Sequence, residues 1–272
     1  LLTAALASAL AANLSFGQDA VKAEDQYVVL SYFKVDQENL AAFEEWSRTN
    51  SKKVFTEMMN QAGSNLWGWN VARILYRGPD DDAPTHVAAS IYNGPPPGTL
   101  EPAALDALYK KITAMDPAEY RKRLNSLREL LGTELVRGIA WAGGSSPEGS
   151  YRVVTYSRLE PRRAAAHREA AASTWQPIYA AAAKEGKILA WSSWSYVFPR
   201  GMDAPYDILG ATTYKDLPAA VRGYTNMQAD FLKVHPTKSW VGAVDEFRGN
   251  VTNRKAVVSR IIASVSKNVT RQ

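Results

Sequence analysis

The chain carries one strand-like stretch twice, first as Tyr27-Val28-Val29-Leu30-Ser31-Tyr32-Phe33-Lys34-Val35 and again as Tyr151-Arg152-Val153-Val154-Thr155-Tyr156-Ser157-Arg158-Leu159. Both stretches are rich in β-branched and aromatic residues, which favours strands. The correspondence continues beyond them, pairing Glu45 with Glu169, Gly63 with Gly186, Trp69 with Trp191, Arg77-Gly78 with Arg200-Gly201, and Asp82-Ala83-Pro84 with Asp203-Ala204-Pro205. A period of about 120 residues is too long for a solenoid and indicates a duplicated domain.

Each copy shows the same order of expected elements, judged by hydrophobic periodicity and by Gly and Pro at the breaks. The first copy predicts a strand at 27–35, a helix at 38–61, strands at 66–76 and 86–92, a helical region at 102–131 and a strand at 135–141. The second copy predicts a strand at 151–159, a helix at 162–185, strands at 188–198 and 206–214, a helical region at 218–251 and a strand at 256–265.

This order, βαββα(β), is the split-βαβ pattern of ferredoxin-like folds. The predicted fold class is therefore α+β, with two tandem ferredoxin-like units (26–142 and 150–265) forming a pseudo-dimeric α+β barrel. The Gly-, Ser- and Pro-rich segment 143–149 is the expected linker. Each sheet leaves one face without helices, and two such faces can bury each other. Because this pairing is satisfied within one chain, we expect a monomer, with further assembly left open.

Composition excludes several classes of protein. The chain has 272 residues, a net charge of +5 from 32 basic and 27 acidic residues, and no cysteine. The basic residues are scattered, which argues against nucleic-acid binding. Without cysteine there is no disulfide, thiolate nucleophile or iron–sulfur cluster. The three histidines lie far apart in the sequence, so we expect no metal site. The sequence also lacks a P-loop, a GxGxxG and a GxSxG motif, so no cofactor is predicted.

The first residues have the character of an export signal. Leu1 to Leu14 is an apolar run rich in Ala and Leu, and small residues at Ser15 and Gly17 suit cleavage before Gln18. We therefore expect residues 1–17 to be a signal peptide and the mature protein to be periplasmic or secreted. The run is too short for a stable membrane span. An exposed N-terminal helix is the alternative.

The order of elements resembles the dimeric α+β barrel superfamily, which includes the antibiotic-biosynthesis monooxygenase-like and the stress-responsive A/B barrel proteins. The second copy also looks like a group of exported bacterial proteins of unassigned function. The similar stretches are Trp175-Gln176-Pro177-Ile178, Ile188-Leu189-Ala190-Trp191, Val197-Phe198-Pro199, Lys233-Val234-His235-Pro236 and Trp240. The resemblance implies a fold rather than one activity, because the superfamily hosts monooxygenases, haem enzymes and isomerases.

In such barrels a ligand is expected between sheet and helices or inside the barrel, so aromatic residues on strands are candidates for ligand binding. The candidate ligand-binding residues are Tyr32, Tyr156, Trp69, Trp191, Trp194 and Tyr196. The alternative is that these aromatics only pack the core and the interface between the copies.

The histidines are candidates for catalysis. His86 begins a strand and is replaced by Asp207 in the second copy, so it is either a general base or a half-exposed residue at the end of a strand near a sheet edge. His235, in a Val-His-Pro loop beside Trp240, is the stronger candidate, and its alternative role is a loop hydrogen bond that orders the start of the helix. His167 is expected on a solvated helix face. Glu45 and Glu169 are expected to form salt bridges on helix surfaces, although a catalytic carboxylate pair is also conceivable.

Three functions follow as hypotheses. The first is a barrel that binds a small apolar or aromatic molecule, with cofactor-independent oxygenase or isomerase activity left open. The second is a non-catalytic interaction or structural protein, since the eight Trp and thirteen Tyr would also suit an interface. A closed, filled barrel would favour it. The third is haem binding through His235 or His167, which the resemblance suggests.

Overall fold

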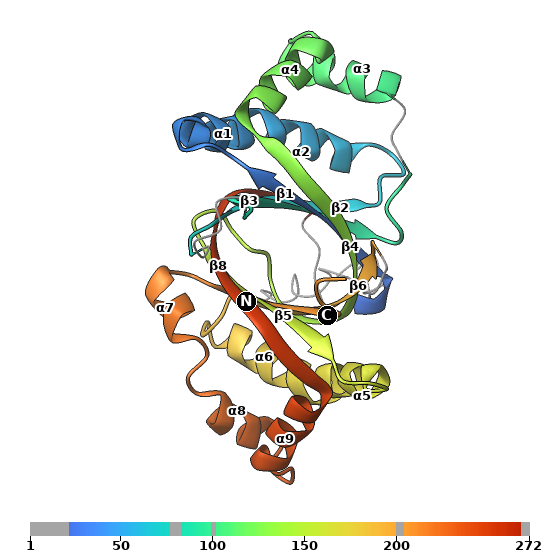
Figure 1. The fold of residues 1–272 in the computed structure, drawn as a ribbon. Coiled ribbons are helices and arrows are strands. Elements are labelled where there is room, and N and C mark those ends of the chain that lie inside the picture. The colour runs from blue at the N-terminus through green and yellow to red at the C-terminus, as the bar shows by residue number, and fades with distance from the viewer. Residues whose placement is uncertain (1–21, 77–82, 99–101, 200–203, 268–272) are drawn as a thin grey trace, which may run out of the picture.

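The computed structural model describes residues 22–76, 83–98, 102–199 and 204–267 (Figure 1). The predicted signal peptide and the matched pairs Arg77-Gly78 and Arg200-Gly201 lie outside these residues. Within the described part of the chain, eight strands close into one antiparallel barrel in the order β1-β3-β2-β8-β5-β7-β6-β4. The strands are β1 (Gln26–Lys34), β2 (Leu66–Ile74), β3 (His86–Asn93), β4 (Glu129–Gly143), β5 (Tyr151–Leu159), β6 (Ala190–Phe198), β7 (Ile208–Tyr214) and β8 (Val251–Ser266).

The helices cover two opposite sides of the barrel, α1 to α4 on one side and α5 to α9 on the other (Figure 1). They are α1 (Leu40–Trp46), α2 (Lys52–Asn60), α3 (Pro102–Thr113), α4 (Pro117–Leu127), α5 (Ala164–Ala170), α6 (Gln176–Lys184), α7 (Leu217–Arg222), α8 (Met227–Val234) and α9 (Trp240–Asn250). A π-helical turn joins α1 to α2 (Ser47–Ser51), and another joins α5 to α6 (Ala171–Trp175). The two turns keep the same spacing as Tyr27 and Tyr151, so the halves match even in this irregular feature.

The strand order of each half is that of a ferredoxin-like sheet, β4-β1-β3-β2 in the first half and β8-β5-β7-β6 in the second. The predicted fold class is confirmed. The halves join where β2 pairs with β8 and where β4 pairs with β6. Closure leaves the barrel without free sheet edges, which otherwise tend to aggregate.

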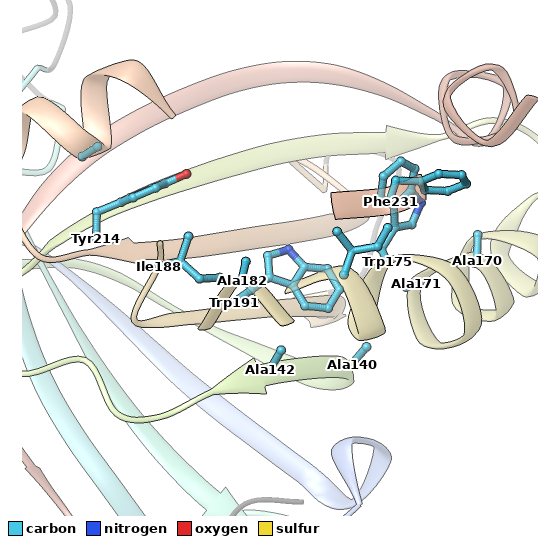
Figure 2. Close-up of a cluster of buried hydrophobic side chains, with 12 residues drawn as sticks. Ala140, Ala142, Ala170, Ala171, Trp175, Ala182, Ile188, Trp191, Tyr214 and Phe231 are labelled. Carbon is cyan, nitrogen blue, oxygen red and sulfur yellow. The ribbon is translucent and has the colours of Figure 1, made fainter. Parts of the chain in front are cut away.

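The long strands β4 and β8 hold the two halves together, because each packs into the helix layer of the other half. Ala140 and Ala142 of β4 pack into the helix layer of the second half, around Trp175, Trp191 and Phe231 (Figure 2). In the same way β8 of the second half contributes Ala263 to the helix layer of the first. A third apolar cluster fills part of the barrel interior. Each half therefore needs the other to complete its core.

Two of the predicted helical regions, 102–131 and 218–251, are divided into shorter helices in the structure. The region 102–131 is two helices, because Asp116 caps α4 by accepting a hydrogen bond from Ala118 N at 2.9 Å, with Pro117 at the first helical position. Strand β4 already begins at Glu129. The region 218–251 is three helices, the first ending at Gly223, whose φ of 69° is readily adopted by glycine.

Candidate functional site

The barrel encloses a cavity of about 540 Å³. It exists because successive residues of a strand point to opposite faces of the sheet, so every second side chain points inward. On β1 and β5 the inward residues form matched sets, Val28, Leu30 and Tyr32 against Arg152, Val154 and Tyr156. Most of the wall is apolar, formed by Val28, Leu30, Val87, Ala89, Ile91, Val136, Val154, Trp194, Leu209 and Ala211.

A cation, Arg152, interrupts this apolar wall. Its Nη1 donates to the Oδ1 of Asn70 on β2 at 3.2 Å, and β5 places Arg152 between Thr213 of β7 and Ser259 of β8. No carboxylate among the described residues lies within 4.0 Å of its guanidinium. Burial lowers the pKa of Arg152 to about 10, so the side chain stays charged at neutral pH. The residue is partly exposed and lines the cavity.

The base of the cavity is lined by Tyr32 and Tyr156, which contact Glu134 and Tyr206 behind them. Tyr32 and Tyr206 both donate to Oε2 of Glu134 on β4, at 2.9 Å and 2.6 Å. The ring of Tyr206 also meets the rings of Tyr156 and Tyr196 edge-on, at 4.8 Å and 4.9 Å between centroids. Burial is the main cause that raises the pKa of Tyr32, Tyr156 and Tyr206. These hydroxyls are therefore hydrogen-bond donors throughout the physiological range.

The mouth of the cavity lies at the opposite end, beside the segment 144–148 that links β4 to β5. The Nζ of Lys52 lies 2.5 Å from Oε1 of Glu148, and that carboxylate also accepts from the backbone N of Ser264 at 3.1 Å. The linker predicted from composition is thus fastened to α2 and to β8 and forms part of the rim.

The predicted aromatic residues fall into two groups. Tyr32, Tyr156 and Trp194 line the cavity, and the indole Nε1 of Trp194 donates to Ser192 Oγ at 2.7 Å. Tyr196 contributes to the tyrosine cluster through Tyr206. Their positions fit a role in ligand binding, which remains a prediction.

Trp69 and Trp191 border the cavity but belong mainly to the helix layers. Trp69 stacks on Phe55 at 4.6 Å and Trp191 stacks on Tyr179 at 4.5 Å, the same contact in both halves. Each pair connects a strand to the helix above it.

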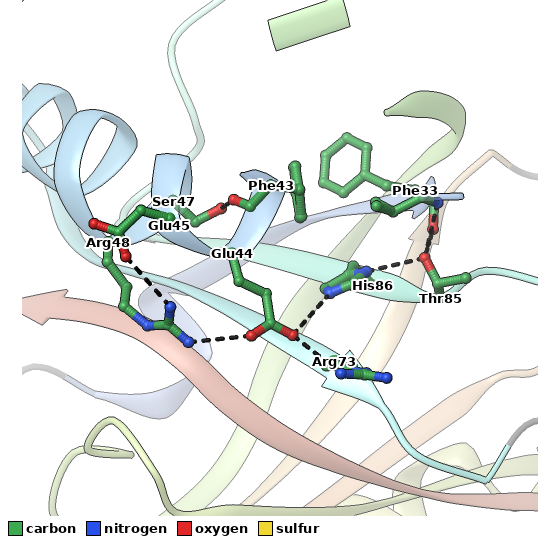
Figure 3. A network of polar contacts seen from close by, with 10 residues as sticks. Phe33, Phe43, Glu44, Glu45, Ser47, Arg48, Arg73, Thr85 and His86 are labelled. Atoms are coloured by element: carbon green, nitrogen blue, oxygen red, sulfur yellow. Dashed lines mark hydrogen bonds and ion pairs between the residues drawn. The ribbon is translucent and has the colours of Figure 1, made fainter. Parts of the chain in front are cut away.

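The structure places His86 outside the barrel, under α1 (Figure 3). Its Nε2 lies 3.8 Å from Oε1 of Glu44, its Nδ1 lies 2.9 Å from Thr85 Oγ1, and its ring meets Phe43 edge-on. The expectation of a half-exposed residue is wrong, because 0% of the side chain is exposed. The neighbouring Glu45, by contrast, lies on the helix surface and pairs with Arg48 at 3.6 Å.

His235 also lies away from the cavity, at the end of α8. Its Nε2 lies 3.0 Å from the carbonyl oxygen of Thr174, and its ring contacts Phe231 at 5.2 Å. This contact fastens the end of α8 to the π-helical turn. The structure therefore does not bring His86 and His235 together, nor either of them to the cavity.

His167 is buried, at 3% exposure, where a solvated helix face was expected. Its ring packs near Phe247, and neither ring nitrogen has a hydrogen-bond partner within the described part of the chain. In the same layer Trp175 contacts Phe231, Trp240 and Phe247, so a haem beside His167 would have to displace this cluster. The residues present do not fit a haem group there. No group of three metal-ligating side chains occurs in the described residues.

The sequence interpretation missed Arg152, Asn70, Glu134 and Tyr206. Arg152 could have been found from the repeat itself, because it replaces Val28 of the first copy on the same face as the matched Tyr32 and Tyr156. Glu134 fell in the gap between a helix predicted to end at 131 and a strand predicted to begin at 135.

Two solved structures are similar to this chain over most of its length. One is a putative monooxygenase from Fusobacterium nucleatum, with 12% identity and a TM-score of 0.54, covering 89% of this chain and 94% of that one. The other is a putative monooxygenase from Lactobacillus acidophilus, with 9% identity and a TM-score of 0.54, covering 90% and 97%. Neither a protein-family model nor a curated protein matches the sequence. At such low identity the likeness shows the fold alone. In the described residues no helix has the length and apolar character needed to cross a membrane.

Proposed function

We propose that this chain, whose fold is that of the dimeric α+β barrel proteins, binds a small and largely apolar molecule inside its barrel. The cavity of about 540 Å³ carries the proposal. Its size lies within the range of small-molecule sites, and its wall combines apolar side chains with a few polar groups, as such sites do. A filled barrel would have favoured the alternative of a purely structural protein.

A fluorescent, uncharged reporter tests the proposal. N-phenyl-1-naphthylamine is dim in water and bright in apolar surroundings, so we expect its fluorescence to rise saturably with the protein. The double variant Ala89→Phe/Ala211→Phe places two large rings in the cavity and should abolish this rise. The matched control, Ala165→Phe on the exposed face of α5, should retain it. Fluorescence that persists in the filled barrel, or that never appears, would contradict the proposal.

A second candidate is chemistry on the bound molecule without a cofactor, as an oxygenase or isomerase. The hydroxyl of Tyr156 favours it, because Tyr156 lines the cavity, whereas the single hydroxyl proton of Tyr32 is donated to Glu134. A protonated hydroxyl aimed at a developing enolate oxygen would stabilise that oxygen. An assay of oxygen-dependent conversion of 1,8-dihydroxyanthrone to its anthraquinone tests this activity. The rate should fall in Tyr156→Phe and be unchanged in Tyr76→Phe, and a rate equal to the buffer blank would exclude the reaction.

Export belongs to the same proposal. Cleavage before Gln18 is expected from the apolar run and the small residues that precede it. N-terminal sequencing of the protein recovered from the periplasm or medium of a bacterial host tests it. A product that stays in the cytoplasm with residues 1–17 attached would be evidence against export.

A further inference from the structure

We propose that the ligand of the barrel is a carboxylic acid with an apolar body, and that Arg152 binds its carboxylate. This inference rests on the proposed function, because it needs the cavity to hold a ligand. It narrows the ligand from apolar molecules in general to amphipathic anions.

The side chain of Arg152 is suited to binding a carboxylate. A guanidinium carries five N–H donors in a planar fork that matches a carboxylate. In the described residues only Nη1 has a side-chain partner, the neutral amide oxygen of Asn70 at 3.2 Å. Arg152 itself lines the cavity. A desolvated cation without an opposite charge is costly, so the wall is completed by an anion supplied from outside the chain.

The other charged side chains near the cavity already have partners within the chain. Lys52 and Glu148 at the rim pair with each other at 2.5 Å. Glu134 at the base accepts from the two tyrosines. Arg152 is therefore the cation that remains available to a ligand among the described residues that line the cavity.

The positions of Arg152 and Tyr156 along β5 set the orientation of the ligand. Arg152 is the second residue of β5 and lies toward the mouth, whereas Tyr156 lies deeper along the same strand. Apolar side chains such as Val154 and Leu30 fill the distance between them. A carboxylate at Arg152 would leave the body of the molecule against these side chains and the tyrosine rings. The negative charge of Glu134 at the base opposes the reverse orientation.

The site suits a carboxylate better than a phosphate monoester. A phosphate monoester carries nearly two negative charges at neutral pH and is commonly bound by several cations or backbone N–H groups. The cavity offers one guanidinium with a neutral amide beside it. A carboxylate, which is planar and carries one negative charge, therefore matches Arg152 more closely than a phosphate monoester does.

The experiment compares 2-naphthoate with 2-naphthamide, which have the same ring system and nearly the same shape but differ in charge. Isothermal titration calorimetry of the full chain should show 2-naphthoate binding about 10-fold or more tighter, as expected for a charge-assisted hydrogen bond. In Arg152→Met this preference should vanish, while 2-naphthamide binds within about 3-fold of the wild type. Arg123→Met, which removes an exposed arginine from α4, should leave the preference intact.

The outcomes separate this inference from the proposed function. If N-phenyl-1-naphthylamine enters the barrel but 2-naphthoate binds no tighter than 2-naphthamide, or the preference survives in Arg152→Met, the assignment of Arg152 is overturned and the apolar site stands. If none of the three compounds binds, the proposed function itself fails. Should Arg152→Met not fold, Arg152→Lys provides the test, because it keeps the charge but loses the planar fork, and 2-naphthoate should then bind more weakly.

Discussion

The hydroxyl of Tyr206 lies 2.6 Å from Oε2 of Glu134, and this hydrogen bond joins the two halves of the chain at the base of the barrel. Tyr206 precedes β7 of the second half, whereas Glu134 lies on β4 of the first. Tyr32 donates to the same oxygen at 2.9 Å. At the base of the cavity, one carboxylate oxygen thus accepts a hydrogen bond from a tyrosine of each half.

Tyr206→Phe is expected to lower the free energy of unfolding by about 1.5–3 kcal/mol, the range for a hydrogen bond to a charged group. The side chain is 2% exposed, so little solvent can replace the lost donor. Urea denaturation measures the change. Tyr76→Phe, at a residue that is 60% exposed, should shift stability by less than about 0.5 kcal/mol. Equal stability of the two variants would show that the Glu134 contact contributes nothing.

Stability should fall between pH 6.5 and about pH 4 because of His167. Burial, followed by the nearby charge of Arg168, lowers its pKa from 6.5 to about 4. The ring is therefore neutral in the folded state, while the unfolded state takes up a proton as the pH falls below 6.5. The stability present above pH 6.5 is lost across this window, by about 3 kcal/mol at its acid end.

Two variants test this expectation for His167. His167→Leu and His167→Gln both remove the titrating ring, so both should lose this part of the pH dependence in denaturation curves. Leu should be the more stable of the two, because the surrounding Ala170 and Phe247 are apolar and offer an amide no partner. An unchanged slope between pH 6.5 and pH 4 in either variant would assign the effect to another group.

The barrel was predictable from the sequence because the strand-like stretch that begins at Tyr27 has a similar counterpart at Tyr151. Tyr32 and Tyr156 were chosen as a matched pair, and both line the cavity. Trp69 and Trp191 were matched equally well, yet they stack on Phe55 and Tyr179 of the helices. A repeated aromatic residue indicates a repeated contact. It does not reveal which face of the sheet makes that contact until the register of the strand is known.

The polar part of the site was harder to predict, because it depends on differences between the copies. Arg152 replaces Val28, and its partner Asn70 lies on a strand distant in sequence, so only the closed barrel brings them together. Glu134 follows Leu130 and Leu131, whose apolar side chains suggested a helix but are 58% and 40% exposed at the start of β4. The histidines drew attention by residue type, although all three pack outside the cavity.

Glu44 should make the protein more sensitive to acid below pH 4.5. The contact with His86 is the main cause that lowers the pKa of Glu44 below its ordinary value of 4.5, with Arg73 and Arg48 assisting and burial opposing. A carboxylate with a lowered pKa contributes stability that is present above pH 4.5 and is lost as the pH falls through its folded value. Denaturation of Glu44→Gln between pH 5 and pH 3 should therefore show a shallower acid slope than the wild type.

The matched control for Glu44 is its neighbour. Glu45→Gln removes a carboxylate that is 65% exposed and contacts only Arg48 among the charged residues described, so the acid slope should stay that of the wild type. If both variants behave alike, the buried contact with His86 does not set the slope.

Gly143 and Gly149 bound the segment between the halves, and they should respond differently to alanine. Both have positive φ, 83° and 82°, so each substitution carries a backbone cost of about 1–2 kcal/mol. A Cβ on Gly149 would meet no atom within 4 Å, but one on Gly143 would lie 2.5 Å from the carbonyl oxygen of Leu189. That oxygen also accepts a hydrogen bond from Gly144 N at 3.0 Å, which limits how far it can move. Urea denaturation should show Gly143→Ala to be the more destabilised variant by at least about 1 kcal/mol. Equal losses would mean that β4 and β6 part easily at this point, and the rim of the cavity would then be looser than its contacts indicate.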